Sequence, residues 1–141
     1  MAEIEMAINS VRHGLQRDEW AIILKEKTAE HHGPVRYMPI YVGTSEADIV
    51  GRELWCMESP HLAYFDIFPR DIDTRFSKLE SVVINRFQDN VFYAKLRLSQ
   101  RGERYEVGHS LPKALALSAR VRAPIFAEET VLNKAATKVD S

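Results

Sequence analysis

The chain has 141 residues, of which 45% are hydrophobic and 28% are charged, and its formal net charge at pH 7 is −1. This length is enough for one domain with a substantial core, and the composition is ordinary for a globular protein. The near-zero charge argues against the large basic surface that most nucleic-acid-binding domains carry. The single cysteine excludes an intrachain disulfide and a cysteine zinc cluster, and it favours a reducing compartment.

From the sequence we expect neither a targeting segment nor a membrane-spanning segment. Its N-terminus, Met1–Glu5, carries acidic residues where a secretory signal carries lysine or arginine. No segment approaches the roughly 18 apolar residues that a membrane-spanning helix needs. We therefore expect a cytoplasmic protein without a membrane partner.

Strand-like segments occupy the first third of the chain. Each is rich in apolar or β-branched residues, and the breaks between them contain charged or Gly-Pro turn sequences. The three predicted strands are residues 3–12, 20–24 and 35–42. A helix should follow from Thr44 or Ser45, either of which is a suitable N-cap, to about Leu54.

The second half repeats this order with clearer turns. After an irregular segment over residues 56–77, for which we expect one or two short helices, three more strands are predicted. They are residues 79–87, 91–98 and 103–107. A helix with Ser110 as its N-cap comes next. The remaining predicted segments are an extended piece at 123–126, a short helix at 128–135 and a flexible tail at 136–141.

The two halves share a short sequence where a strand meets a helix. Val42–Ser45 reads Val-Gly-Thr-Ser, and Val107–Ser110 reads Val-Gly-His-Ser. This repetition predicts an α+β fold of two β-β-β-α units, about residues 4–55 and 79–122, in which Gly43 matches Gly108. The units would form mixed or antiparallel sheets with helices packed against them, in one domain of residues 1–135. Because such sheets leave edges that need cover, we expect a homo-oligomer, most simply a dimer.

An ordered series of short matches resembles the bifunctional nuclease (BFN) domain family. In the second half the matching residues are Leu79–Ile84, Asp89–Leu96, Glu106-Val107, Ala114–Leu117, Arg122–Phe126 and Glu129–Leu132. In the first half Pro39–Gly43, Glu46-Ala47 and Ile49 resemble the family's strand-to-helix junction. The resemblance covers most of residues 5–132 and implies an α+β fold from two intertwined β-β-β-α units, which agrees with the repeat. It also implies a protein class that cleaves both DNA and RNA.

The chain departs from the family pattern at several polar positions. The family usually carries an Asp, an Arg and a second Asp around the start of its second helix, where this chain has Gly108, Ser110 and Lys113. The family's His-Asp pair in the middle connection is matched here by Phe65 and Asp66. If those polar residues perform the chemistry, activity in this chain is reduced or altered, whereas the apolar residues that specify the fold are intact.

Several carboxylates are candidates for holding a metal ion. Hydrolysis of a phosphodiester with Mg²⁺ or Mn²⁺ needs oxygen ligands, and the available carboxylates are Glu46, Asp48, Asp66, Asp71, Asp73 and Glu106. Of these, Glu46 and Asp66 are the predicted metal ligands and catalytic residues. Glu46 matches the family pattern at a helix start. An acidic residue in a first helical turn is also explained by its favourable interaction with the helix dipole.

Aromatic and basic residues alternate with apolar ones in the strand at 91–98. Tyr93, Lys95 and Arg97 share one face, and Arg104 extends the basic side across the hairpin. Such a face can bind DNA or RNA through base stacking and phosphate contacts. A solvated face of an antiparallel sheet gives the same alternation without any ligand.

The loop that opens the second helix holds two further candidates. His109 is a candidate catalytic acid or base near neutral pH, and Ser110 is a candidate for binding phosphate together with the helix N-terminus. A solvated histidine and an ordinary N-cap serine are the alternative interpretations.

These features leave two hypotheses for function. The first is a BFN-type, metal-assisted nuclease that acts on DNA and RNA. The second is a non-catalytic member of the same fold that acts as an oligomeric regulatory or nucleic-acid-binding module. The breadth of the family resemblance favours the first, and the replaced polar residues favour the second.

Overall fold

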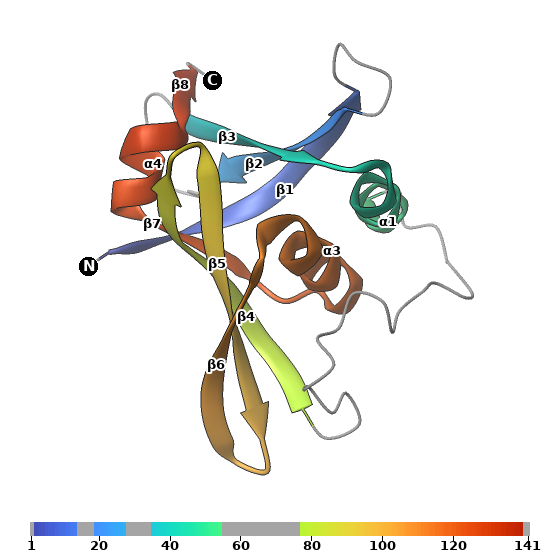
Figure 1. Cartoon of the computed structure of the whole chain (residues 1–141), viewed down its shortest axis with the longest axis vertical. Helices are drawn as coiled ribbons and strands as arrows, with labels where there is room; N and C mark the ends of the chain where they lie inside the picture. Colours follow the sequence, from blue (N-terminus) through green and yellow to red (C-terminus); the bar gives the residue numbers. More distant parts are fainter. Residues whose placement is uncertain (1, 14–18, 28–34, 55–76, 140–141) are drawn as a thin grey trace.

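The computed structural model describes residues 2–13, 19–27, 35–54 and 77–139. The predicted short helices within 56–77 lie outside these residues. The elements, shown in Figure 1, are β1 (Glu3–His13), β2 (Trp20–Glu26), β3 (Val35–Val42), α1 (Thr44–Leu54), β4 (Ser77–Gln88), β5 (Val91–Gln100), β6 (Glu103–Ser110), α3 (Leu111–Val121), β7 (Ile125–Glu128), α4 (Glu129–Ala135) and β8 (Thr137–Val139).

The described strands form one mixed sheet in the order β6-β5-β4-β7-β1-β2-β3-β8. Strand β7 pairs antiparallel with β1 and parallel with β4, so it joins the first three strands to the next three. The other pairings are antiparallel. The predicted α+β fold class is therefore confirmed. Among the described residues, none of the helices has the length and apolar character of a membrane span.

The order of three strands and a helix occurs twice, as β1–β3 with α1 and as β4–β6 with α3. In the sheet the two groups of strands lie on opposite sides of β7. The intertwining of the two units and their superposition stay predictions.

The two glycines of the repeated sequence stand at different distances from the helices that follow them, and their equivalence in a superposition of the two units stays a prediction. Gly43 stands directly before α1, and its carbonyl accepts the N–H of Ala47 at 3.1 Å. Gly108 lies inside β6, opposite Lys95. The second helix begins later because Pro112 suits only its first turn, which makes Ser110 the N-cap.

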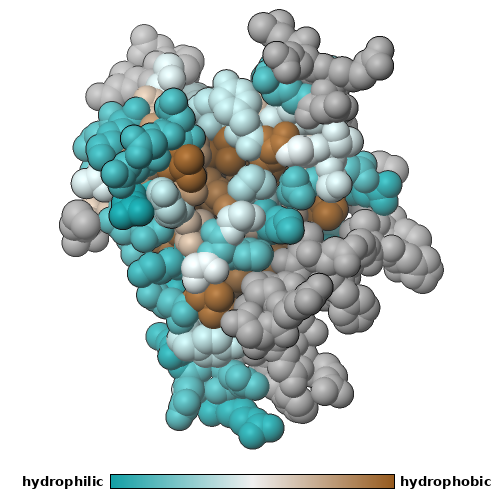
Figure 2. All heavy atoms as spheres, viewed as in Figure 1, coloured by the Kyte–Doolittle hydropathy of each residue, from teal (hydrophilic) through white to brown (hydrophobic). Residues whose placement is uncertain are grey.

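Helix α3 lies at the centre of the core. Figure 1 shows it between the strands β1–β3 and the strands β4–β6, and α1 packs beside it. Its buried apolar residues are Leu111, Ala114, Leu115, Ala116 and Leu117. Full burial of a leucine stabilises a fold by roughly 1.5–3 kcal/mol, so this helix is a main source of stability. In Figure 2 apolar residues gather in the middle of the view, and hydrophilic residues border them.

The C-terminal segment differs from the predicted tail of residues 136–141. Thr137–Val139 form β8, which pairs antiparallel with β3 through Val35, Arg36 and Tyr37. Helix α4 brings this segment to the edge of the sheet, and an ion pair between Glu129 and Arg36 connects α4 to β3. Such a non-local pairing leaves no periodic signal in a short, polar sequence.

Candidate functional site

The exposed face of β5 and β6 holds the predicted substrate-binding residues. Ala94, Leu96 and Leu98 are buried, so the alternating residues of β5 face away from the core. Tyr93 lies opposite Ser110, Arg97 opposite Glu106, and Ser99 opposite Arg104. Residues that lie directly opposite in a sheet share a face. The five side chains Tyr93, Lys95, Arg97, Arg104 and Ser110 are therefore on one face of the sheet.

The cations at the centre of this face are held by carboxylates. Arg97 binds Glu3 (Nη1–Oε1 3.0 Å) and Glu106 (Nε–Oε2 3.3 Å), and Lys95 lies 3.6 Å from Glu106. The hydrogen bond to Glu3 is the main reason why the pKa of Arg97 is raised. A phosphate that binds here has to compete with Glu3 and Glu106.

An aromatic ring on the same face is already stacked with a cation. The Arg86 guanidinium carbon lies 4.3 Å from the centre of the Tyr93 ring, and Tyr93 is 40% exposed. The two residues are opposite one another on β4 and β5, which fixes the stack. A flat, partly exposed ring with a neighbouring guanidinium can stack an unpaired nucleobase.

His109 does not belong to this face, because it lies opposite the buried Ala94. It lines a pocket of about 620 Å³ at the start of α3, where β3 also contributes Ile40 and Tyr41. Ser110 and Tyr93 line the same pocket. Ser110 takes the predicted N-cap position, but its side chain makes no capping hydrogen bond.

The predicted metal ligands are only partly described. Glu46 is half-buried in the first turn of α1, and its Oε1 atom would lie 3.2 Å from a Cβ atom added at Gly43. The carboxylate therefore turns back to the helix start, as in a capping arrangement. Asp66 lies outside the described residues. Within the described ranges no three His, Cys, Asp or Glu side chains are grouped to hold a metal, so those residues alone do not make the predicted site.

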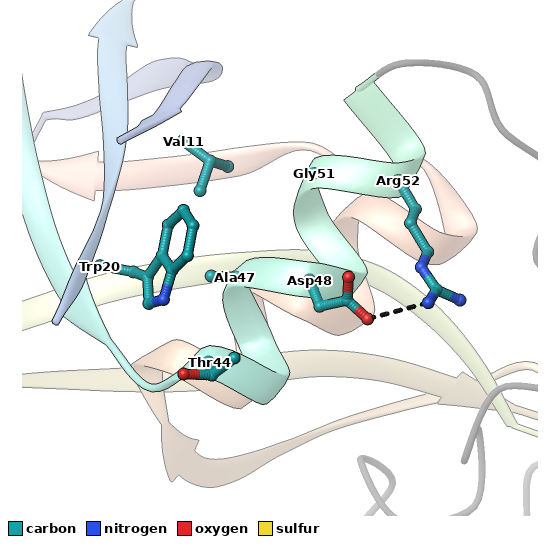
Figure 3. A pocket seen from close by; sticks show the side chains of 7 residues that line it. All are labelled: Val11, Trp20, Thr44, Ala47, Asp48, Gly51 and Arg52. Atoms are coloured by element: carbon teal, nitrogen blue, oxygen red, sulfur yellow. Dashed lines mark ion pairs between the residues drawn. The ribbon is translucent and has the colours of Figure 1, made fainter. Parts of the chain in front are cut away.

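A pocket beside α1 was not foreseen from the sequence. It has a volume of about 330 Å³, with Trp20, Val11 and Ala47 as its apolar walls. Figure 3 shows the Trp20 ring directed towards α1, and Asp48 and Arg52 facing one another across one helical turn at 3.2 Å. Thr44, Ala47 and Gly51 recur at helical spacing, and this row of small residues was the available signal.

Comparison with known proteins identifies the family. The model of the bifunctional nuclease domain matches residues 22–140. Uncharacterized proteins of Mycobacterium tuberculosis, from strains H37Rv and CDC 1551, are each 28% identical over 131 residues, or 93% of this chain and 75% of the relative. The family match confirms the resemblance drawn from the short ordered motifs. The chain belongs to the bifunctional nuclease domain family.

Proposed function

We propose that this protein is a metal-assisted nuclease that acts on DNA and RNA in the cytoplasm. Family membership supports this proposal, because the match spans most of the chain. The single structural observation that supports it best is the Arg86–Tyr93 stack beside Lys95 and Arg97 on one open face.

The stack favours unpaired bases over a base-paired duplex. A base held in a duplex presents only its edge to a protein surface, whereas an unpaired base can lie flat on the Tyr93 ring. Arg104 and Ser110 lie on the same face and are available for backbone contacts. The substrate-binding surface of the proposal is therefore Tyr93, Lys95, Arg97, Arg104 and Ser110.

Mg²⁺ or Mn²⁺ is the cofactor of this proposal, with Glu46 and Asp66 as its carboxylate ligands. A divalent ion would stabilise the negative charge that develops on a phosphodiester during hydrolysis. Since the described residues alone do not assemble the site, the proposal assigns no reaction step to either carboxylate. His109 stays the proposed acid or base.

A non-catalytic nucleic-acid-binding module is the second candidate. Two observations favour it: Lys95 and Arg97 already have carboxylate partners, and Gly108, Ser110 and Lys113 stand where the family usually carries Asp, Arg and Asp. In this case the protein would bind single strands as an oligomer without cutting them.

Parallel binding and cleavage measurements separate the candidates. Labelled single-stranded and duplex DNA and RNA are incubated with purified protein, and both retention on the protein and fragment length are measured. A nuclease binds and shortens the single strands. A binding module retains them at full length, and a protein that neither binds nor cuts any of them contradicts both candidates.

A further inference from the structure

Strand β6 forms one end of the sheet, and no described strand lies beyond it. It is eight residues long, whereas the strand at the opposite end, β8, has three. A long edge strand offers a row of main-chain donors and acceptors to another strand. In Figure 1 the outer side of β6 lies at the border of the molecule.

The turn before β6 determines which main-chain groups point outwards. Arg101 and Gly102 have positive φ angles of 52° and 84°, as in a two-residue hairpin turn, and Gln100 lies opposite Glu103. The residues that flank such a turn form a hydrogen-bonded pair, and the pairs then alternate along the ladder. The main-chain N–H and C=O groups of residues 103, 105, 107 and 109 therefore point to β5. The same groups of residues 104, 106, 108 and 110 point outwards, away from the sheet edge.

This alternation restricts how a second copy of β6 can pair with the first. In a symmetric antiparallel pair, outward-facing residues of one copy must lie opposite outward-facing residues of the other. Centring the pair on residue 104 would place two arginines together, and centring it on residue 106 would place two glutamates together. Like charges directly opposite one another are unfavourable.

The arrangement centred on Tyr105 is the complementary one. It places Arg104 opposite the partner's Glu106, and symmetry creates this pair twice. Both side chains lie on the exposed face of the sheet, because Arg104 is opposite Ser99 and Glu106 is opposite Arg97. Arg104 makes no ion pair with another described residue. Glu106 already lies 3.6 Å from Lys95 and 3.3 Å from Arg97 of its own chain, but 47% of its side chain stays exposed and can accept a further cation. Centring on Val107 instead would leave both charges opposite neutral residues.

We propose that two copies of this chain pair through β6, antiparallel and centred on Tyr105, so that their sheets become continuous. The partner is a second copy of this chain, and the recognition elements are the main chain of β6 and the Arg104–Glu106 pairs. This inference gives the expected homo-oligomer a specific interface. It does not require nuclease activity.

The pairing would also extend the candidate nucleic-acid surface. A two-fold axis perpendicular to the sheet keeps the same face exposed in both copies, so both Tyr93 rings and both Arg86 side chains lie on one surface. A single strand could then contact two copies, which increases its apparent affinity. In this dimer Arg104 is engaged by the partner's Glu106, so the shared surface consists of Tyr93, Lys95, Arg97 and Ser110 of each copy.

Charge reversal tests the pairing through dimer dissociation constants measured by analytical ultracentrifugation. Arg104→Glu and Glu106→Arg should each weaken the dimer at least about tenfold, because each places like charges together. Because Glu106 also holds Lys95 and Arg97 of its own chain, the reversal is read in a mixture: Arg104→Glu and Glu106→Arg together should form a heterodimer at least about tenfold tighter than either variant's homodimer, since only the heterodimer restores opposite charges in both pairs. Lys134→Glu, on the exposed surface of α4, makes the same change in net charge as Arg104→Glu and should leave the dimer unchanged.

Disulfide trapping tests the register independently. In a Cys56→Ser background, Tyr105→Cys should give an oxidised dimer, because residues at the centre of the pair have Cα atoms about 4.5 Å apart, within disulfide range. Val107→Cys should not. A natural protein that is monomeric up to high concentration, or a dimer insensitive to Arg104→Glu, overturns the proposal. Trapping at 107 but not at 105 overturns the register. None of these outcomes depends on cleavage of nucleic acid.

Discussion

Arg36 of β3 and Glu129 of α4 are joined by two hydrogen bonds, Nη1–Oε1 at 2.7 Å and Nη2–Oε2 at 3.1 Å, although 93 residues separate them in the chain. The same guanidinium binds Glu26 of β2, whose side chain is 6% exposed. This cluster of Arg36, Glu26 and Glu129 connects two neighbouring strands to the C-terminal helix.

The cluster gives the first prediction, on stability. Arg36→Met should lower the free energy of unfolding by about 3 kcal/mol, because it leaves the buried carboxylate of Glu26 without its cation. Adding Glu26→Met should recover part of this loss, since the buried charge is then removed as well. Urea unfolding of the two variants measures both effects. Equal stability of Arg36→Met and the natural protein would show that the cluster contributes nothing.

The pH dependence of this contribution follows from the arginine. Hydrogen bonds from Arg36 to Glu26, and then to Glu129, raise the pKa of Arg36. The pKa of Arg36 is thus higher in the folded protein than in the unfolded chain, so the stabilisation that its charge provides is fully present below the unfolded-state pKa. It is lost only as the pH rises through the folded-state pKa. From about pH 6 to about pH 10 the difference in unfolding free energy between the natural protein and Arg36→Met should therefore stay constant. A steady fall of that difference across this range contradicts the assignment.

Gly51 gives a second prediction, on the helix beside the Trp20 pocket. Apart from its chain neighbours and the backbone of its own helix, an alanine methyl group at this position would have no described atom within 4 Å. Glycine inside a helix costs about 1 kcal/mol relative to alanine, so Gly51→Ala should raise the unfolding free energy by about that amount. Thermal and urea unfolding measure it. A loss of stability would show that the space beside Gly51 is occupied in the folded protein.

The exposed face gives a third prediction, on binding. Replacing both Lys95 and Arg97 by alanine should weaken binding of single-stranded nucleic acid and reduce its dependence on salt, because fewer phosphate contacts release counterions. Tyr93→Leu should weaken binding by about 1–3 kcal/mol at every salt concentration, because it removes stacking rather than charge. Fluorescence anisotropy over a salt series distinguishes the two patterns. The control is Lys134→Ala on α4, which should bind as the natural protein does.

The carboxylates give a fourth prediction, on cleavage. Glu46→Gln and Asp66→Asn should each reduce cleavage at least about tenfold, because each keeps the size of the side chain and removes an anionic ligand that a hard cation needs. Asp48→Asn is the matched control on α1, since Asp48 is exposed and paired with Arg52. Cleavage that is reduced equally by Glu46→Gln and Asp48→Asn would assign the effect of Glu46→Gln to helix α1 rather than to a metal site.

Local sequence patterns predicted most of the regular structure. The strands β4, β5 and β6 follow from alternating residues and from the turns at Asp89-Asn90 and Arg101-Gly102, whose positive φ angles suit short hairpins. The face shared by Tyr93, Lys95 and Arg97 follows from the same alternation. These features depend on residues close together in the sequence, so one sequence is enough to identify them.

Non-local relationships were beyond such patterns. The parallel pairing of β7 with β4, the placement of β8 beside β3 and the contact between Arg36 and Glu129 each join distant segments. The carboxylate partners of Arg97 include Glu3, which is 94 residues away. The alternation predicted which face Arg97 occupies, but not that Glu3 would neutralise it there.

The measurement that tests the central claim most directly is a time course of cleavage of labelled single-stranded RNA and DNA by the purified protein. The account predicts shortening of both substrates with Mg²⁺ or Mn²⁺, arrest on addition of EDTA, and recovery when excess metal is restored. Full cleavage in EDTA would contradict the metal-assisted mechanism. Intact substrates under every metal condition, with binding retained, would contradict the nuclease function and leave the binding module.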